Sequence, residues 1–402
     1  MDNTKKVILF NKKEDCSGCS ACVSACPVSA IDFREDNEGF LYPYINTDLC
    51  IQCGKCVRIC PITGDRDNKE SPKKYYAARI NDSSVRMESS SGGIFSLLAE
   101  WIESKHGVIY GAEFDADYTV RHSRAEHSKE WTKFKTSKYL QSRMENIFLQ
   151  VKNDLIAGRF VLFTGTPCQI SGLINYLGET SKEKLITCDL ICHGTPSPKI
   201  WVEYLKFIEK SNQRKIGYVN FRSKENSGWH RSKLNILDIN GEVLVDEGQE
   251  NNLFFKLFSN NLILRPSCYI CKYADIRRPG DITLGDFWGI EKLFQEFDDN
   301  KGISLIICNT EKGENILEKI SKDMTYFEVQ QEQCIQPNLE RPSYCPETRQ
   351  RFWHNYFKRG GIYAAKQLGL ISCNMRDQII FFYDRVINKI MRLKRNEDSG
   401  TL

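Results

Sequence analysis

Short apolar runs rich in Val, Ile, Tyr and Phe alternate with longer amphipathic stretches from about residue 74 onwards. The short runs predict strands at residues 75–80, 108–114, 160–166, 185–192, 281–287 and 303–309. The amphipathic stretches predict helices at residues 92–104, 145–157, 199–210 and 314–321. This alternation predicts an α/β domain with a largely parallel sheet, with its chemistry at the strand ends. Within residues 234–248, Asn240 and Gly241 predict the turn of a hairpin.

The first 61 residues follow a different pattern, which is set by cysteine. Residues 16–27, CSGCSACVSACP, and residues 50–61, CIQCGKCVRICP, share the spacing C-x2-C-x2-C-x3-C-P. Structural zinc sites are the alternative, but zinc usually takes two separated pairs of ligands. A cubane cluster takes three thiolates from one tight loop and the fourth from the other run. The spacing therefore predicts one [4Fe–4S] cluster on Cys16, Cys19, Cys22 and Cys60, and a second on Cys50, Cys53, Cys56 and Cys26.

Residues 10 to 65 resemble the bacterial two-cluster ferredoxins through this doubled motif. Such a small module has little apolar content, so we expect metal binding to supply its folding energy. Residues 63–74 are polar and contain a proline, which indicates a linker. We therefore expect a ferredoxin-like α+β module at residues 1–65, an α/β domain at 74–335, and a helical C-terminal extension at 336–402.

The 402 residues include 17 cysteines, so the redox compartment matters. The amino terminus has only VILF as an apolar core, which is too short for a secretory signal. We expect a cytoplasmic protein, because closely spaced cysteines in a reducing compartment bind metal more often than they form disulfides. No apolar run approaches the ~18 residues of a membrane span, so we expect no transmembrane segment.

Four further cysteines fall near the ends of predicted strands or in loops. Thiolates from three separate segments are a candidate ligand set for a third cluster. By spacing alone, a zinc site or simply buried thiols are equally good interpretations. The four are Cys168 in TGTPCQISG, Cys192 in DLICHGTPS, and Cys268 with Cys271 in RPSCYIC.

Six motifs in register resemble the coenzyme F420 hydrogenase/dehydrogenase beta-subunit family, from about residue 74 to residue 310. They are SSSGGIFSLL, SKYLQS, TGTPCQISGL, DLICHGTPS, NFRSKENSGW and ADIRRPGDITLGDFWGI. The resemblance implies FAD, one [4Fe–4S] cluster in the core domain and hydride chemistry at the flavin. It places the core cluster on Cys168, Cys192, Cys268 and Cys271. Cys188 is a competing ligand because it has the same strand parity as Cys192, but only Cys192 is followed by the His-Gly of the family pattern.

A flavin must be held by its pyrophosphate, and a Ser-Gly run precedes the helix predicted at residues 92–104. Free backbone N–H groups at a helix start favour an anion, although such runs often serve only as helix caps. Lys138 is a further candidate, with an ordinary solvated lysine as its alternative. The candidate flavin contacts are Ser89, Ser90, Ser91, Gly92, Gly93, Lys138, Gly165 and Thr166.

Other residues in the family motifs have a functional and a structural interpretation. Basic residues serve either the acidic groups of a cofactor or nearby surface carboxylates, and aromatic residues line either a pocket or the core. His193 either relays protons or makes a structural hydrogen bond. No catalytic acid or base is assigned. The residues concerned are Arg222, Lys224, Arg277, Arg278, Asp286, Phe287 and Trp288.

The formal net charge of +4 comes from basic residues scattered among 52 acidic ones. Three [4Fe–4S] clusters with their thiolates would contribute about −6, so the basic excess compensates the cofactors. We therefore expect no nucleic-acid partner. The last segment predicts a helix with one apolar face, for docking onto protein or onto an anionic membrane. That face comprises Ile379, Phe382, Val386, Ile390 and Leu393.

The sequence predicts an iron–sulfur flavoprotein oxidoreductase with three [4Fe–4S] clusters and FAD. Electrons would pass between ferredoxin-type clusters and a hydride-exchanging partner, with ferredoxin or coenzyme F420 as the redox partner and an unidentified small organic substrate. The main alternative is a non-catalytic electron-transfer beta subunit of a larger hydrogenase or dehydrogenase, which would have a subunit partner. A metal-stabilised binding protein without redox function is a second alternative.

Overall fold

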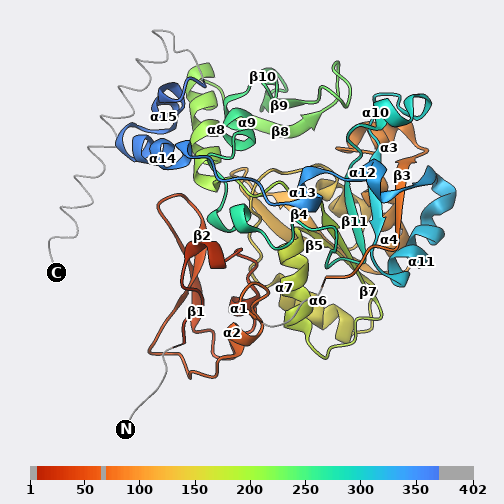
Figure 1. Cartoon of the computed structure of the whole chain (residues 1–402), viewed down its shortest axis with the longest axis horizontal. Coiled ribbons are helices and arrows are strands. Elements are labelled where there is room, and N and C mark those ends of the chain that lie inside the picture. Colours follow the sequence, from red (N-terminus) through yellow and green to blue (C-terminus); the bar gives the residue numbers. More distant parts are fainter. Residues whose placement is uncertain (1–6, 65–68, 371–402) are drawn as a thin grey trace.

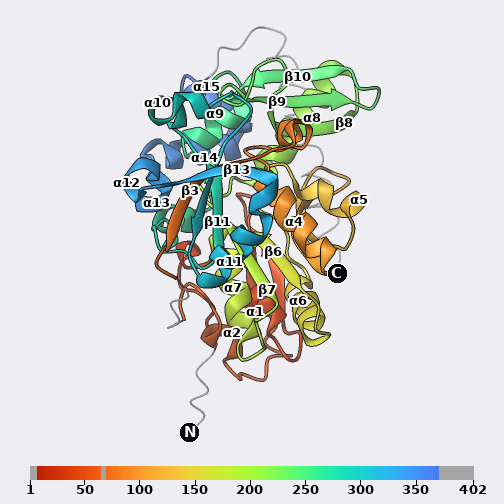
Figure 2. The same cartoon turned by 90° about the vertical axis from the view of Figure 1, so that its right-hand side faces the viewer.

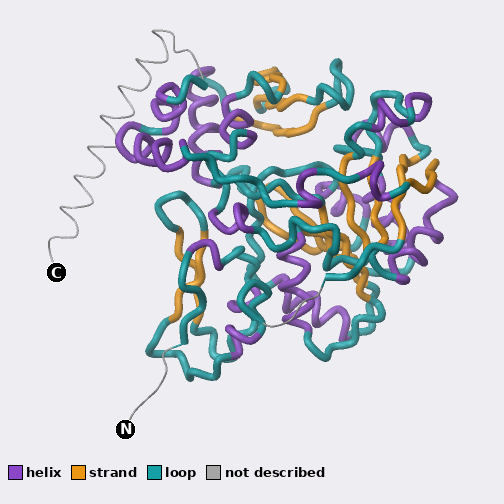
Figure 3. The backbone as a smooth tube through the Cα atoms, viewed as in Figure 1, coloured by secondary structure: helices purple, strands orange, loops and turns teal. Residues whose placement is uncertain are grey.

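The computed structural model describes residues 7–64 and 69–370. A small N-terminal module lies beside a large sheet covered by helices, and a second, smaller sheet lies above the large one in both views (Figures 1 and 2). Much of the N-terminal module is loop (Figure 3). The predicted fold class, a small module followed by a mixed α/β domain and C-terminal helices, is confirmed.

The two cysteine runs of the N-terminal module fold alike. Each leads into a one-turn helix, α1 (Ala21–Ser24) or α2 (Lys55–Arg58). The residue before each helix is left-handed, with φ 72° at Ser20 and 66° at Gly54. Between the runs, β1 (Ile31–Glu35) pairs antiparallel with β2 (Leu41–Ile45). The same spacing has thus produced the same loop twice.

Within the described residues, eight strands form the main sheet, in the order β13-β3-β12-β11-β7-β6-β4-β5. All six strands predicted from the apolar runs lie in it. The sequence did not predict β5 and β13. The strands are β3 (Lys74–Ile80), β4 (Val108–Phe114), β5 (Val120–Ala125), β6 (Val161–Gly165), β7 (Leu185–Leu190), β11 (Ile282–Asp286), β12 (Ser304–Cys308) and β13 (Met324–Val329).

The expected parallel pairing occurs only in the middle of this sheet. There β11, β7, β6 and β4 are parallel neighbours. The flanking pairs are antiparallel, namely β4 with β5, β11 with β12, β12 with β3 and β3 with β13. The prediction of a largely parallel sheet was therefore wrong at both edges. Short apolar runs give no information on strand direction, which depends on the connections.

Helices cover both faces of the main sheet. On one face, α4 (Ile94–Ser104) and α11 (Glu311–Ile320) pack on Ile186, Ile282 and Ile306. On the other, α6 (Ile147–Ile156) and α7 (Pro167–Leu177) pack on a second apolar cluster that includes Phe163. Alternate residues of each strand supply the two clusters. Short helices complete this part: α3 (Ser83–Glu88), α5 (Ser128–Trp131), α10 (Ile290–Leu293), α12 (Gln331–Cys334) and α13 (Pro337–Glu340).

The second sheet has the order β10-β9-β8 and contains the predicted hairpin. Gly241, with φ 82°, lies in the turn between β9 and β10. One apolar cluster joins this sheet to helices before and after it, and Phe352 and Trp353 of α14 belong to that cluster. The elements are α8 (Pro198–Asn212), β8 (Ile216–Ser223), β9 (Lys233–Asp238), β10 (Val243–Gly248), α9 (Leu253–Ser259), α14 (Thr348–Arg359) and α15 (Gly361–Gln367).

Single-turn 3-10 helices connect several of these elements: Lys13–Asp15, Thr132–Phe134, Pro266–Ile270, Gln295–Phe297 and Ser321–Asp323. The predicted last helix with its apolar face lies outside the described residues. Among the residues that are described, no helix is both long and apolar enough to cross a bilayer.

A buried ion pair ties β7 to the segment before β11. Arg278 and Asp189 are almost completely buried, and Arg278 Nη2 lies 3.0 Å from Asp189 Oδ1. Asp189 also accepts hydrogen bonds from Gly280 N and Thr283 Oγ1, both at 2.9 Å. The guanidinium of Arg278 therefore pairs with a carboxylate of the protein itself, which is the structural interpretation of this residue. Neighbouring Arg277 is exposed and pairs with Asp275.

We expect Arg278→Met to lower the free energy of unfolding by about 3–5 kcal/mol, because it leaves the Asp189 carboxylate buried without its cation. Arg277→Met is the matched control, since an exposed pair contributes less than about 1 kcal/mol. Urea unfolding of the anaerobically purified full chain measures both. Equal losses in the two variants would contradict this account of the buried pair.

Candidate iron–sulfur and flavin sites

The structure brings Cys16, Cys19, Cys22 and Cys60 together, and we call this group the inner site. Burial raises the pKa of the Cys19 thiol, and the nearby Cys60 and Cys16 thiols raise it further. The pKa of Cys22 rises for the same reasons, with Cys19, Cys16 and Cys60 all near it. The cysteine of the second run thus joins three from the first, as the doubled motif predicts.

We call the second predicted set, Cys26, Cys50, Cys53 and Cys56, the outer site. Burial raises the pKa of Cys56, and proximity to Cys53 and Cys26 adds to it. Cys26 Sγ accepts a hydrogen bond from Ala30 N at 3.1 Å. Cys53 is exposed, so this site lies at the protein surface.

The core site is a cavity of about 260 Å³ whose lining includes all four candidate cysteines of the α/β domain. Cys168 lies in the first turn of α7, Cys192 follows β7, and the other two lie in or just after the Pro266–Ile270 turn. Burial raises the pKa of Cys192, and the thiols of Cys268, Cys168 and Cys271 raise it further. The core site is therefore Cys168, Cys192, Cys268 and Cys271.

Cys188 lies in a different part of the domain from Cys192. It is buried on β7 within the apolar cluster beneath α4 and α11. It does not line the cavity of the core site. This placement favours Cys192 as the ligand. Cys308 and Cys334 are also buried in apolar clusters, and Cys345 is exposed, whereas Cys373 lies outside the described residues.

The donors at the core site fit a four-iron cluster. It offers four thiols, and its polar neighbours point hydrogen-bond donors at sulfur. Thr195 N lies 3.4 Å from Cys268 Sγ, and Thr166 Oγ1 lies 3.2 Å from Cys168 Sγ. Over residues 7–64 and 69–370, no group of three or more His, Cys, Asp or Glu side chains is placed to hold a single metal ion.

The inner site lies directly against the core domain. Cys19 and Ala21 pack in the apolar cluster of α6 and α7. A Cβ on Gly172 of α7 would come within 3.0 Å of Cys19 Sγ, so glycine permits this close approach. The thiol of Cys168, one turn earlier on α7, is near enough to raise the pKa of Cys19. The inner and core sites are therefore neighbours.

Side chains of the core domain hold both loops of the inner site. Gln141 Nε2 donates to Ser17 O at 3.1 Å. Asn175 Nδ2 donates to Ile59 O at 3.1 Å, and Tyr273 OH donates to Pro61 O at 3.1 Å. These bonds orient the module so that its inner site, and not its outer site, faces the cavity.

The candidate flavin loop, residues 89–93, lies at the same edge of the main sheet as the C-terminal end of β11. Gly92 N donates to Ser304 Oγ at 3.0 Å, and Ser304 pairs with Asp286 across β12 and β11. Lys224 Nζ donates to Ser91 O at 2.9 Å. Ser90 Oγ accepts from Ser137 N at 2.7 Å. The loop is thus joined to β12, to the residue that follows β8 and to the segment after α5.

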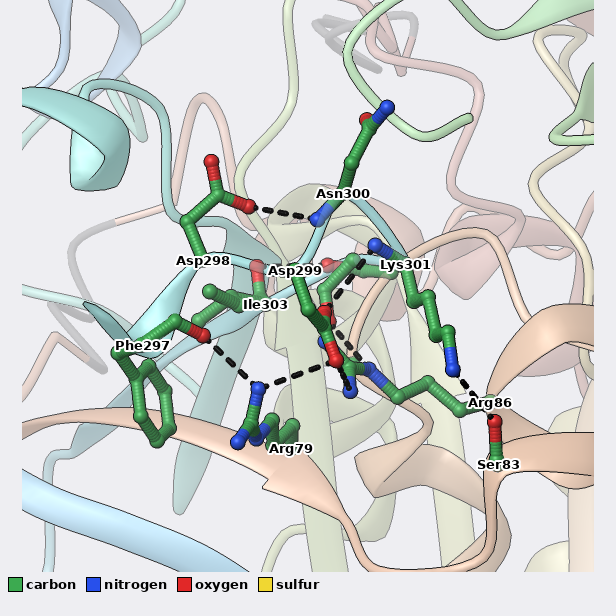
Figure 4. Close-up of polar contacts among 12 residues, drawn as sticks. Arg79, Ser83, Arg86, Phe297, Asp298, Asp299, Asn300, Lys301 and Ile303 are labelled. Carbon is green, nitrogen blue, oxygen red and sulfur yellow. Dashed lines mark hydrogen bonds and ion pairs between the residues drawn. The ribbon is translucent and has the colours of Figure 1, made fainter. Parts of the chain in front are cut away.

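A charged network fixes the helix that precedes this loop (Figure 4). Arg86 of α3 points toward Asp299, with its Nη1 2.8 Å from Asp299 Oδ2, and its Nε donates to Gly302 O at 2.8 Å. Arg79 approaches Asp299 from β3 at 3.2 Å. Lys301 Nζ donates to Ser83 Oγ at 3.2 Å. These contacts hold the segment 298–303 against α3.

Arg222 lies two residues before Lys224, which binds the flavin loop, and it has one unused donor. Its Nη1 donates to Asp286 Oδ2 at 2.8 Å and to Tyr139 OH at 3.1 Å. Its Nη2 is buried without a partner among the described residues. The guanidinium lies 5.3 Å from the ring centre of Trp288, which stacks on Trp229 at 5.1 Å and is 45% exposed. Phe287 is fully buried in the core.

This region fits an anionic group such as a flavin pyrophosphate. Helix α4 begins after Gly93 without a side-chain cap, so backbone N–H groups of its first turn lack a side-chain partner. Arg222 adds a buried cation with a free N–H group. The serine hydroxyls contribute less, because Ser89 and Ser91 donate to the backbone carbonyls of Val85 and Ile303.

The other candidate flavin contacts are engaged within the protein or lie beside the core site. Lys138 Nζ donates to Lys133 O at 2.7 Å and to Thr136 O at 2.9 Å, and burial lowers its pKa to about 7. Gly165 ends β6, and Thr166 caps α7 beside Cys168. His193 lines the core cavity with its Nε2 2.7 Å from Asn261 Oδ1, consistent with the structural hydrogen bond.

Sequence reasoning did not single out Gln141, Tyr139 or Trp229, although all three lie within the six family motifs. A tyrosine or tryptophan in a motif is more often a core residue, and only the contacts with Arg222 and Trp288 distinguish these two.

We predict that Cys192→Ala lowers the iron content from about twelve to about eight atoms per chain, because a four-iron cluster loses a ligand. Cys188→Ala is the matched control and should keep the wild-type content. Iron and acid-labile sulfide in anaerobically purified protein measure the difference. If Cys188→Ala lost the iron and Cys192→Ala kept it, Cys188 would be the ligand.

Comparison with known proteins agrees with the motifs. Residues 158–333 match the family model for the C terminus of the coenzyme F420 hydrogenase/dehydrogenase beta subunit, and residues 15–63 match the 4Fe-4S dicluster domain. No curated protein matches the chain. A chain of the xenon-derivatised F420-reducing [NiFe] hydrogenase complex from Methanosarcina barkeri is 17% identical, with a TM-score of 0.44, over 65% of this chain and 84% of that chain. The family prediction is confirmed for the region that matches: residues 158–333 have the C-terminal domain of the coenzyme F420 hydrogenase/dehydrogenase beta-subunit family, and a 4Fe–4S dicluster domain precedes them.

Proposed function

We propose that this chain is an iron–sulfur flavoprotein oxidoreductase that holds three [4Fe–4S] clusters and FAD. The observation that carries the proposal is the order of its sites. The outer site is exposed at Cys53, and the inner site packs on α7. The core site includes Cys168, which lies in the first turn of the same helix. Such a line from the surface to a buried cavity suits the passage of single electrons.

When bound, iron–sulfur clusters exchange single electrons and FAD exchanges either single electrons or a hydride, so a chain holding both can connect the two chemistries. Two single electrons and one proton make a hydride. A ferredoxin-class donor must therefore deliver two electrons for each hydride that leaves for an organic acceptor. With reduced coenzyme F420 as donor, one hydride would enter at the flavin, and two single electrons and one proton would leave.

The protein's own residues would bind and orient these groups. Cys168, Cys192, Cys268 and Cys271 would hold the core cluster within the cavity. Residues 89–93 and the uncapped start of α4 would receive the flavin pyrophosphate. Arg222 would donate its free Nη2 to an anionic oxygen there. This assignment drops Lys138, because its ammonium group is already bonded to backbone carbonyls.

A second candidate function is an electron-transfer subunit of a larger hydrogenase or dehydrogenase. Apolar side chains beside the outer site favour a protein partner there, since Leu49 is 52% exposed and Ile51 is 61% exposed on either side of Cys50. A subunit would need its catalytic partner for turnover. The proposed enzyme would reduce its own flavin.

We expect the anaerobically purified chain to contain about twelve irons and one FAD, the sum of three four-iron clusters and one flavin. Mixing it with reduced ferredoxin, and separately with reduced coenzyme F420, should bleach the flavin absorbance with at least one of them. Eight irons without flavin would contradict the proposal. Full cofactor content with no flavin reduction by either donor would favour the subunit function.

Arg222→Met should weaken the affinity for FAD about tenfold or more, because a hydrogen bond to a charged group contributes about 1.5–3 kcal/mol. Arg214→Met is the control: Arg214 lies just before β8, is exposed and pairs with Glu242. FAD titration of the deflavinated holo-cluster protein, followed by flavin fluorescence, measures both variants. Unchanged affinity in Arg222→Met would remove Arg222 from the flavin site.

A further inference from the structure

Arg265 connects the N-terminal module with the core site. Its side chain is completely buried, and its guanidinium reaches into the inner site from the core domain. Nε donates to Cys16 O at 2.8 Å and Nη1 donates to Gln141 Oε1 at 2.9 Å. Nη2 donates to Leu41 O at 3.1 Å and lies 3.6 Å from Cys16 Sγ. One side chain thus binds a ligand loop, a ligand sulfur and the strand β2.

The backbone of Arg265 belongs to the wall of the core site. Its N–H donates to Thr195 O at 2.9 Å, and its carbonyl accepts from Cys268 N at 2.9 Å. Thr195 N in turn lies 3.4 Å from Cys268 Sγ. The backbone of Arg265 therefore lies at the core site, while its charged guanidinium lies at the inner site.

The charge of Arg265 has no carboxylate partner among the described residues. Other buried arginines do: Arg278 pairs with Asp189, Arg222 with Asp286, and Arg86 with Asp299. The rings of Tyr42 and Phe40, with centres 4.2 and 5.6 Å from the guanidinium carbon of Arg265, contribute only weak cation–π attraction. Because burying an unpaired cation is costly, an anion must offset it.

The neighbouring cysteine groups are the available anions. Four thiolates with a [4Fe–4S]2+ core carry about −2, so two such groups would flank this guanidinium.

We propose that Arg265 is a shared counter-charge for the inner and core clusters, which holds the module in place and raises the reduction potentials of both. Reduction adds one negative charge to a cluster, and a fixed cation nearby favours the more negative state. An electron passing between the two clusters would make or break no bond and move no proton. The reductant is a low-potential one-electron donor of the ferredoxin class.

For the core cluster, this inference rests on the proposed function, whereas the inner cluster lies in the dicluster domain. Arg265 acts through the ligand sulfurs and the hydrogen bonds around them, so it is a positioning residue. Its test must therefore measure the reduction potentials of the clusters.

The experiment is a redox titration of the full chain with its clusters, followed by EPR, for wild type, Arg265→Met and Arg265→Lys. In Arg265→Met, we expect the reduction equilibria of the inner and core clusters to shift tenfold or more toward the oxidised state, which is about 59 mV for a one-electron couple. The outer cluster serves as the internal reference and should not shift. Arg265→Lys keeps the charge and should recover most of the shift.

Arg349→Met is the matched control for docking. Arg349 crosses the same interface through an ion pair with Glu38. Its other hydrogen bonds go to Tyr269 OH and Leu264 O, and none within the described part of the chain reaches a cysteine sulfur. Removing it should loosen the module without moving the potentials. If Arg349→Met produced the same shift, docking and not charge would be the cause, and the proposal would fall.

Other results are equally decisive. Twelve irons with unchanged potentials in Arg265→Met would overturn the proposal and leave the proposed function intact, and a shift of the inner cluster alone would overturn the sharing. Eight irons in the wild type would contradict the core cluster itself. If Arg265→Met does not fold, Arg265→Gln keeps a donor for Cys16 O without the charge and carries the same prediction.

Discussion

The parallel alignment of β11, β7, β6 and β4 is the constraint on which both candidate sites depend. Parallel strands end at the same edge of a sheet, so the segments that follow them converge there. Cys168 follows β6, Cys192 follows β7, and Asp286 ends β11. The core cysteines and the flavin loop therefore share one edge, although they come from segments far apart in the chain.

The N-terminal module depends on that edge in turn. Its inner site packs on α7, the helix that begins beside Cys168, and side chains of the core domain bind the carbonyls of both inner-site loops. Because the outer site is exposed, the module has one end toward solvent and one toward the cavity. This arrangement orders three cysteine groups without any movement of the module.

Burial of charge distinguishes structural arginines from candidate functional ones. Arg278 is fully neutralised by Asp189 and its guanidinium also binds backbone carbonyls, which makes it part of the framework. Arg222 keeps one free donor, and Arg265 has no carboxylate at all among the described residues. In a medium of low dielectric constant such incomplete pairing is costly, which is why these two arginines are the ones proposed to face an anionic ligand.

The sequence alone determined the features that depend on local spacing. The doubled cysteine motif predicts which run supplies three ligands and which the fourth, because the tight loop needs closely spaced residues. Apolar runs located six strands of the main sheet, and Asn240 with Gly241 located the hairpin turn. Tertiary structure alone decided the antiparallel flanks, the neutralised charge of Arg278, the engaged ammonium of Lys138 and the contact between Arg265 and Cys16. Each of these depends on where a partner far along the chain, or the path of a connection, comes to lie, and local hydrophobic spacing carries no record of that.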